Sequence, residues 1–348
     1  MRTKIEPLED YGFFGPDSMA WKVWGHPTAL TIGFQRAVVV EELDPDLVAS
    51  VEATQDIYNR PATRYDRTIR YFALVAFGGS RTASKAADVL VKVHSKAVGI
   101  EPYGGKVYDA NDPDSQLWIL LTGWHSVLYA YERYGPGKLT PEQDRQFWAE
   151  CAVAAELQTC DPADVPQDRA GLREYYAKMR PQLSGSPLAR KAMNHLLRGE
   201  VALPPMPRTL RPFAVLATRV MRRATIATMP RWMREMSGLR QSRLTDTLVR
   251  PVMRLAFAIA HRSPELSVRL LKLMSPSTVP VAGPMLRGLA PLSAEILSPA
   301  EARERYGYDR PRDAHLALRQ KQLDKALAGQ RTSDEGIVES EPILGRTG

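Results

Sequence analysis

Hydrophobic and polar positions follow a helical period over most of the chain. Between residues 64 and 77, one helical face collects Arg64, Arg67, Thr68, Tyr71, Phe72 and Val75, spaced by three and four residues. Gly78-Gly79 then supplies a helix stop. Thr82 or Ser84 can cap a second helix, which is expected to run to about Val98 and to end before Gly99.

The longest strongly apolar segment, residues 115–131, is preceded by Asp112-Pro113, an N-cap followed by a first-turn proline. A helix is therefore expected from this cap to Tyr134, before a glycine–proline stop. The uncharged run of residues 115–131 is seventeen residues long, which is at the lower limit for a membrane-spanning helix. Because Thr122 and His125 interrupt it with polar groups, the segment predicts a buried helix of a soluble protein.

The rest of the pattern is also helical. Further helices are expected from Thr140 to about Leu157, as two short helices within 170–198, and over 212–229, 244–260 and 264–274. Residues 100–112 read as a connector that turns at Gly104-Gly105, and no alternating strand–helix pattern occurs. The sequence thus predicts an all-α fold of roughly ten helices in one domain, residues 12–310, followed by a polar, loose tail, 311–348.

Composition narrows the class of protein. The 348 residues are 44% hydrophobic and 25% charged, which is typical of a globular chain and argues against disorder. The two cysteines, Cys151 and Cys160, are too few for a disulfide framework. The first eighteen residues carry acids where a secretion signal needs an unbroken apolar run. We therefore expect a reducing, cytoplasmic location.

The positive charge is concentrated in one region. Residues 201–300 contain fifteen Lys and Arg against four Asp and Glu, so this stretch exceeds the overall net charge of +8 by itself. It also holds eight of the twelve methionines. Solvated basic helix faces and a peripheral membrane contact both fit this pattern. Few aromatic residues and no recognisable reading module argue against nucleic acid as a partner.

The sequence lacks the local motifs of common nucleotide-binding, zinc-hydrolase and serine-hydrolase sites. Of six histidines, His94 and His125 fall in the most strongly patterned helices. The residues three and four positions from His94 are apolar, so its imidazole is expected to project from the buried stripe. It is either a core histidine bonded to a backbone carbonyl or a ligand to a metal or haem iron inside a helical bundle.

Two further polar groups accompany apolar helix faces. Arg64 and Arg67 begin the stripe that Thr68 and Tyr71 continue, and guanidinium groups at the mouth of an apolar cavity suit a propionate or carboxylate. The alternative is a solvated helix end with Asp66 as a local partner.

The other polar group is a strip on the helix of residues 113–134, formed by Trp118, Thr122, His125, Ser126 and Tyr129. It could line a substrate cavity or serve internal hydrogen bonding.

Six motifs carry a family resemblance. In chain order they are Gly15-Pro16-Asp17-Ser18 with Trp21; Arg64-x-x-Arg67-Thr68-x-x-Tyr71 with Phe77-Gly78; His94-x-x-x-Val98-Gly99; Tyr108-x-Ala110-x-Asp112-Pro113 with Leu117-Trp118; Ala130-Tyr131-Glu132-Arg133-Tyr134-Gly135; and Met229-Pro230-Arg231-Trp232-Met233-Arg234-Glu235 with Gly238-Leu239. Together, from about Gly12 to Ala290, the chain resembles the MpaB-type oxygenase family, which includes the catalytic domain of the latex-clearing rubber oxygenases.

The resemblance implies an all-α fold around haem b, with one axial histidine, and a reaction that uses dioxygen to oxidise or cleave a hydrophobic, isoprenoid- or lipid-like small molecule. Carried over by position, His94 is the proximal iron ligand and the metal site. Arg64 and Thr68 lie near the haem, and Arg67 occupies the distal side; these three are the catalytic candidates. The predicted cofactor-binding set comprises His94, Arg64, Thr68, Tyr71, Trp118, Thr122 and His125.

Two departures from the family pattern concern the distal side of the haem. Latex-clearing members carry a lysine where this chain has Arg67, and a guanidinium donates hydrogen bonds but does not readily ligate iron. Many members also carry a histidine where this chain has Leu120, and His125 follows one turn later. The alternative interpretation is therefore a non-catalytic haem- or lipid-binding protein, peripheral to a membrane through residues 201–300.

Overall fold

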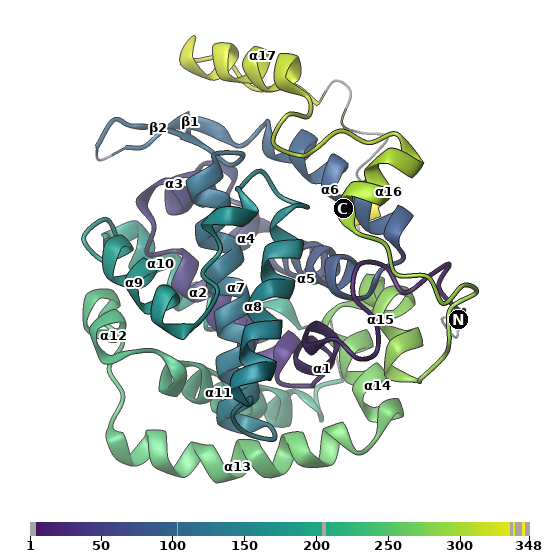
Figure 1. Cartoon of the computed structure of the whole chain (residues 1–348). Helices are drawn as coiled ribbons and strands as arrows, with labels where there is room; N and C mark the ends of the chain where they lie inside the picture. Colours follow the sequence, from purple (N-terminus) through teal and green to yellow (C-terminus); the bar gives the residue numbers. More distant parts are fainter. Residues whose placement is uncertain (1–4, 103, 204–206, 335–336, 338–342, 345–348) are drawn as a thin grey trace.

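Helix α7 (Pro113–Tyr134) runs through the middle of the molecule, and α1, η1, α2, α8 and α13 pack against it (Figure 1). The structure is a computed structural model that describes residues 5–102, 104–203, 207–334, 337 and 343–344. Trp118, Leu121 and Trp124 of α7 are almost completely buried, so the apolar segment is an internal helix, as the sequence predicts. Asp112 caps it by accepting a hydrogen bond from the Ser115 amide.

The described residues contain seventeen α-helices and two short strands. Besides α7, the helices in chain order are α1 (Met19–Trp24), the π-helix η1 (Ala29–Gly33), α2 (Phe34–Glu41), α3 (Pro45–Thr54), α4 (Asp56–Asn59), α5 (Pro61–Phe77), α6 (Ser80–His94), α8 (Pro141–Ala155), α9 (Arg169–Met179), α10 (Pro187–Leu196), α11 (Arg211–Thr228), α12 (Arg231–Ser237), α13 (Arg243–His261), α14 (Pro264–Met274), α15 (Val279–Leu286), α16 (Pro299–Tyr306) and α17 (Leu316–Leu327), with 3₁₀ turns at Pro162–Asp164, Gly199–Ala202 and Pro276–Thr278.

The all-α prediction is confirmed, and the number of helices exceeds the expected ten because the chain is divided more finely than its periodicity indicates. The segment from Asp44 to Tyr58, for example, forms α3 and α4, which are separated by Gln55 at a φ of 57°. Helices of four to eight residues complete too few turns to show a period.

The helix that carries His94 is shorter than predicted. Helix α6 ends at His94, one turn before Val98, because the following residues pair in a hairpin. Strand β1 (Val98–Ile100) runs antiparallel to β2 (Val107–Asp109), and Gly99 lies opposite Tyr108. A Cβ atom at position 99 would lie 2.6 Å from the Tyr108 hydroxyl oxygen, so a larger residue here would displace the Tyr108 side chain.

The C-terminal segment contains a helix where the sequence shows no period. Residues 311–348 are expected to form a loose tail, whereas the structure places α17 against β1 (Figure 1). The preceding residue, His315, lies 2.5 Å from the Asp88 carboxylate of α6, and Lys96 pairs with Asp334. These contacts attach this part of the tail to the end of α6.

Across the parts of the chain that the structure describes, no helix combines the length and the apolar character needed to cross a membrane.

Candidate functional site

His94 is held at the junction of α6, α7 and the hairpin. The Ala110 amide donates to the Ala97 carbonyl at 3.0 Å, which fixes Ala110 beside the end of α6. The carbonyl of Ala110 accepts a hydrogen bond from the His94 ring and another, at 2.6 Å, from Nε2 of Gln116 on α7. Nε2 of Gln116 also lies 3.3 Å from Nδ1 of His94. The imidazole is therefore oriented by a backbone carbonyl and a buried amide.

The imidazole of His94 is desolvated. Burial, with a smaller effect of the Arg64 charge, lowers the pKa of His94 to about 3, so the ring is neutral at pH 7. The residue as a whole is half-buried. A neutral imidazole keeps one ring nitrogen without a proton, and such a nitrogen can bind a metal.

The ligands around His94 restrict the kind of metal it can hold. Nowhere in the described ranges do three or more His, Cys, Asp or Glu side chains come together to hold a metal ion. A metal centre built from protein side chains alone needs such a set. Haem iron takes four ligands from the porphyrin and needs one histidine. The donor set therefore fits haem better than a bare metal ion.

A pair of buried carboxyl groups ends α2, and the sequence reasoning missed it. Oε1 of Glu41 accepts a hydrogen bond from the Thr122 hydroxyl at 3.2 Å, and the Glu41 carbonyl accepts one from the Trp118 indole at 3.3 Å. Trp118 and Thr122, which the sequence places in the cofactor-binding set, thus fix the end of α2 against α7. The next residue, Glu42, is 3% exposed, and its Oε2 has no partner in the structure.

The protonation state of this pair is unusual. Burial raises the pKa of Glu41 to about 7, and Arg64 and the Thr122 hydrogen bond oppose the shift. Burial and the neighbouring Glu41 charge raise the pKa of Glu42 to about 8. The C-terminus of α2 disfavours negative charge as well. A carboxyl group that titrates near neutral pH inside a protein can take up or release a proton in a reaction.

The positive charge of Arg64 affects the pKa values of His94, Glu41 and Glu42. All three groups respond to it in their pKa values, although His94 ends α6 and the two glutamates lie at the end of α2, so Arg64 of α5 lies close to each. The Thr68 hydroxyl donates to the Arg64 carbonyl at 2.9 Å, a bond within the same helix. Arg67 follows Arg64 by three residues on α5, which places both on one side of that helix.

Tyr71 is buried in the core instead of bordering open space. Its hydroxyl donates to the Leu157 carbonyl at 3.0 Å, which ties α5 to the segment after α8.

A second polar cluster surrounds His125 on α7. Its Nδ1 lies 3.2 Å from the Tyr176 hydroxyl of α9. Arg36 of α2, which is 1% exposed, donates to Ser126 Oγ at 2.6 Å and lies 5.3 Å from the centre of the Tyr129 ring. Burial and the Arg36 charge lower the pKa of His125. Arg36 forms no ion pair with any described carboxylate, so this cluster contains a buried, uncompensated positive charge.

The sequence does carry signals for the residues that were missed. Arg36, Glu41 and Glu42 flank the apolar run Ala37–Val40, and charged residues beside such a run deserve inspection. Only the packing of α2 on α7 shows that they are buried.

The fold and the site define an all-α protein in which the desolvated His94 and two buried carboxyl groups, Glu41 and Glu42, are all influenced by the charge of Arg64. Residues 21–262 match the family described as "ER-bound oxygenase mpaB/B'/Rubber oxygenase, catalytic domain". Because this match covers most of the chain, the protein belongs to that family, and the resemblance is confirmed. The chain therefore carries an oxygenase catalytic domain, which implies oxygen and a small molecule as reactants. No curated protein and no solved structure matches the chain significantly.

The lowered pKa of His94 predicts a specific pH effect on stability. In the unfolded chain His94 takes up a proton below pH 6.5, whereas in the folded protein it resists protonation down to about pH 3. Stability from this group is therefore complete above pH 6.5 and falls as the pH drops toward 3. Between pH 7 and pH 5 this group should cost the unmodified chain about 2 kcal/mol in free energy of unfolding. The His94→Gln variant should lack this loss.

Urea unfolding of the cofactor-free protein at the two pH values measures this difference. Glu41→Gln is the matched control with the opposite sign, because the raised pKa of Glu41 makes the carboxyl group favour folding as the pH falls. Parallel pH profiles for His94→Gln and the unmodified chain would contradict the assignment of a desolvated imidazole.

Proposed function

We propose that this protein is a haem b-dependent oxygenase that uses dioxygen to oxidise a hydrophobic, isoprenoid- or lipid-like small molecule, with His94 as the proximal iron ligand. The observation that carries the proposal is the neutral imidazole of His94, held beside the Ala110 carbonyl and the Gln116 amide where α6 ends. Membership in a family of oxygenase catalytic domains supports it. When bound, haem supplies an iron centre that activates dioxygen.

In this proposal the positively charged residues of α5 hold the cofactor. Arg64, whose side chain is exposed, is suited to pair with a haem propionate while it also stabilises the Glu41 carboxylate. Arg67 remains protonated and donates hydrogen bonds on the distal side. Thr68 and Tyr71 support α5 through their hydrogen bonds to Arg64 and Leu157.

Glu41 is proposed as the group that moves a proton. With a pKa of about 7 it is ionised in part of the molecules at neutral pH, and it can accept a proton from the substrate at a carboxylate oxygen. Trp118 and Thr122 keep the end of α2 in place, so the carboxyl group does not have to be reoriented during the reaction. His125, with Tyr176, is proposed to line the polar end of the substrate space.

The iron-ligand assignment predicts a loss of haem. Purified or haem-reconstituted protein should show a Soret band, and His94→Ala should remove most of it because the iron loses its one protein ligand. His195→Ala is the control, since His195 bonds to the Ile57 carbonyl outside this site. Absorption spectra of folded variants measure the effect. A colourless protein that cannot be reconstituted, or an unchanged spectrum in His94→Ala, would contradict the proposal.

The proton-transfer assignment predicts a separation of binding from turnover. Glu41→Gln keeps a hydrogen-bonding side chain but cannot accept a proton, so oxygen consumption with a substrate should fall about 100-fold or more while the Soret band is retained. Glu304→Gln, at an exposed position of α16, is the control. Equal rates in Glu41→Gln and the unmodified protein would exclude Glu41 from catalysis.

A non-catalytic haem or lipid carrier remains the second candidate, favoured by Arg67 and Leu120 at positions where family members carry lysine and histidine. Substrate-dependent oxygen consumption separates the two functions. A carrier binds haem or lipid and shows no turnover with any isoprenoid or lipid.

We also propose that the protein contacts membranes peripherally, through the outer face of α13 within residues 201–300. Helix α13 lies at the edge of the molecule (Figure 1). Its inner side is buried through Val249, Met253 and Phe257. The side turned to solvent carries Leu244, Leu248, Val252, Leu255 and Ile259, each more than half exposed.

The charge around this face favours an anionic lipid surface. Arg243, Arg250 and Arg254 are exposed along one flank of the apolar row, as the helical spacing requires. An apolar face with a basic flank is typical of helices that lie in the membrane interface.

Cys151 and Cys160 are free thiols, which agrees with the cytoplasmic location proposed for the protein.

The membrane assignment predicts a salt-sensitive association. The protein should sediment with vesicles that contain phosphatidylserine, and Leu248→Gln with Leu255→Gln should weaken this by about tenfold or more because less apolar surface is buried. Leu316→Gln on α17 is the control, with a similarly exposed leucine. Association equal in all variants would contradict the assignment, and concentration-dependent dimers without vesicle binding would assign the face to a second copy of the chain.

A further inference from the structure

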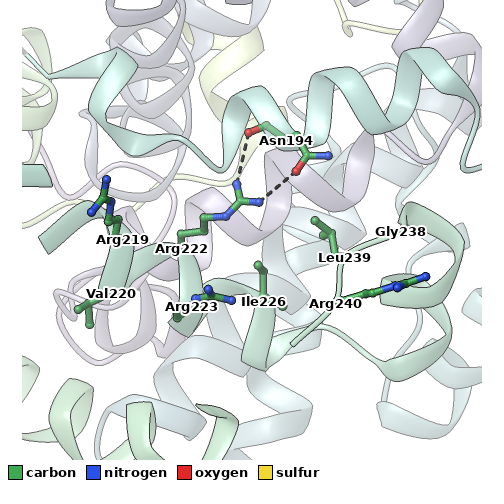
Figure 2. Close-up of a pocket in the computed structure, with 9 residues that line it drawn as sticks. All are labelled: Asn194, Arg219, Val220, Arg222, Arg223, Ile226, Gly238, Leu239 and Arg240. Atoms are coloured by element: carbon green, nitrogen blue, oxygen red, sulfur yellow. Dashed lines mark hydrogen bonds between the residues drawn. The ribbon is translucent and has the colours of Figure 1, made fainter. Parts of the chain in front are cut away.

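We propose that an arginine-lined pocket beside α10 and α11 binds a ligand that carries a phosphate group. The pocket has a volume of about 460 Å³ and includes Asn194, Arg219, Arg222, Arg223, Leu239 and Arg240 among its lining residues. In Figure 2, Arg222 reaches toward Asn194, while Arg219 and Arg240 lie at opposite ends. We call this site the arginine pocket.

The positive charges in the arginine pocket have no anionic counterpart. None of its four arginines forms an ion pair with an acidic side chain that the structure describes. Arg222 donates to the side-chain and backbone oxygens of Asn194 at 3.0 and 3.4 Å, which are neutral acceptors. Burial and the adjacent charge of Arg223 lower the pKa of Arg222. An anion bound between these guanidinium groups would relieve the repulsion.

A carboxylate in the neighbouring pocket, Glu200, does not neutralise the site. A smaller neighbouring pocket of about 290 Å³ shares Asn194, Arg219 and Arg222 and adds Arg198 and Glu200. Glu200 is paired with Arg198 at 3.5 Å, so it offsets the charge of that fifth arginine. The two pockets together still hold a clear excess of positive charge.

The arrangement favours phosphate over a single carboxylate. A phosphate or diphosphate presents several charged oxygens to guanidinium groups that approach from different directions, and each guanidinium can donate two hydrogen bonds. Val220, Ile226 and Leu239 add apolar surface to the same pocket, so the ligand can carry an apolar part. Because these residues belong to α11 and to the connection after α12, binding here does not depend on haem at His94.

Titration of the full-length protein with pyrophosphate tests the site directly. We expect saturable binding by calorimetry at low salt, weakened by added salt because the interaction is ionic. Arg222→Gln and Arg223→Gln should each weaken binding about tenfold, since each removes a charged hydrogen-bond donor. Arg173→Gln, an exposed arginine of α9 outside the pocket, has the same change in charge and should leave binding unchanged.

A second pair of variants controls for the possibility that weaker binding results from misfolding. Arg219→Gln and Arg240→Gln remove exposed side chains that have no hydrogen-bond partner among the described residues, so they should fold normally and still weaken binding. Absence of saturable binding to pyrophosphate and to lipid phosphate alike would overturn the proposal. Equal weakening by Arg173→Gln would do so as well, because it would indicate a general charge effect.

Binding to vesicles distinguishes a phosphate group on a lipid headgroup from one on a soluble compound. Phosphatidic acid and phosphatidylserine are compared at equal surface charge, so that the docking face of α13 contributes equally to both. A preference for phosphatidic acid that Arg222→Gln abolishes assigns the pocket to a lipid headgroup. Pyrophosphate binding without this preference assigns it to a soluble phosphate compound.

Discussion

The desolvated His94 imidazole is the constraint on which the candidate site depends. Its pKa of about 3 keeps the ring neutral, and the Ala110 carbonyl and the Gln116 amide fix its orientation. This arrangement exists because α6 ends at His94 and the hairpin returns Ala110 to the same point. The shape of the hairpin, with Gly99 packed against Tyr108, is therefore part of the site although it carries no reactive group.

Helices α2, α5 and α6 bring together groups that respond to charge in opposite ways. Burial makes the charged forms of His94, Glu41 and Glu42 unfavourable, while Arg64 favours the ionised carboxylates and disfavours a protonated imidazole. A neutral imidazole and a carboxyl group that titrates near pH 7 thus both result from burial, and the charge of one guanidinium acts on both.

The sequence predicted the parts of the fold that long periods describe. The apolar row and the Asp112-Pro113 start located α7, and the spacing from Arg64 located α5, because both helices are long and amphipathic or wholly buried. The end of α6 was predicted too late, since strand pairing of Val98 with Asp109 is a contact between distant residues. Glu41 and Glu42 escaped notice because an acidic pair before Asp44-Pro45 reads as a solvated helix end, and only tertiary packing shows its burial. Helix α17 was missed because its polar sequence shows no apolar stripe.

We propose that the chain binds one haem b through His94. A pyridine haemochrome assay of the reconstituted, gel-filtered protein, combined with its protein concentration, measures the amount and type of haem per chain. We expect one haem b per chain. A stoichiometry near zero after reconstitution, or haem that is removed by gel filtration, would contradict it.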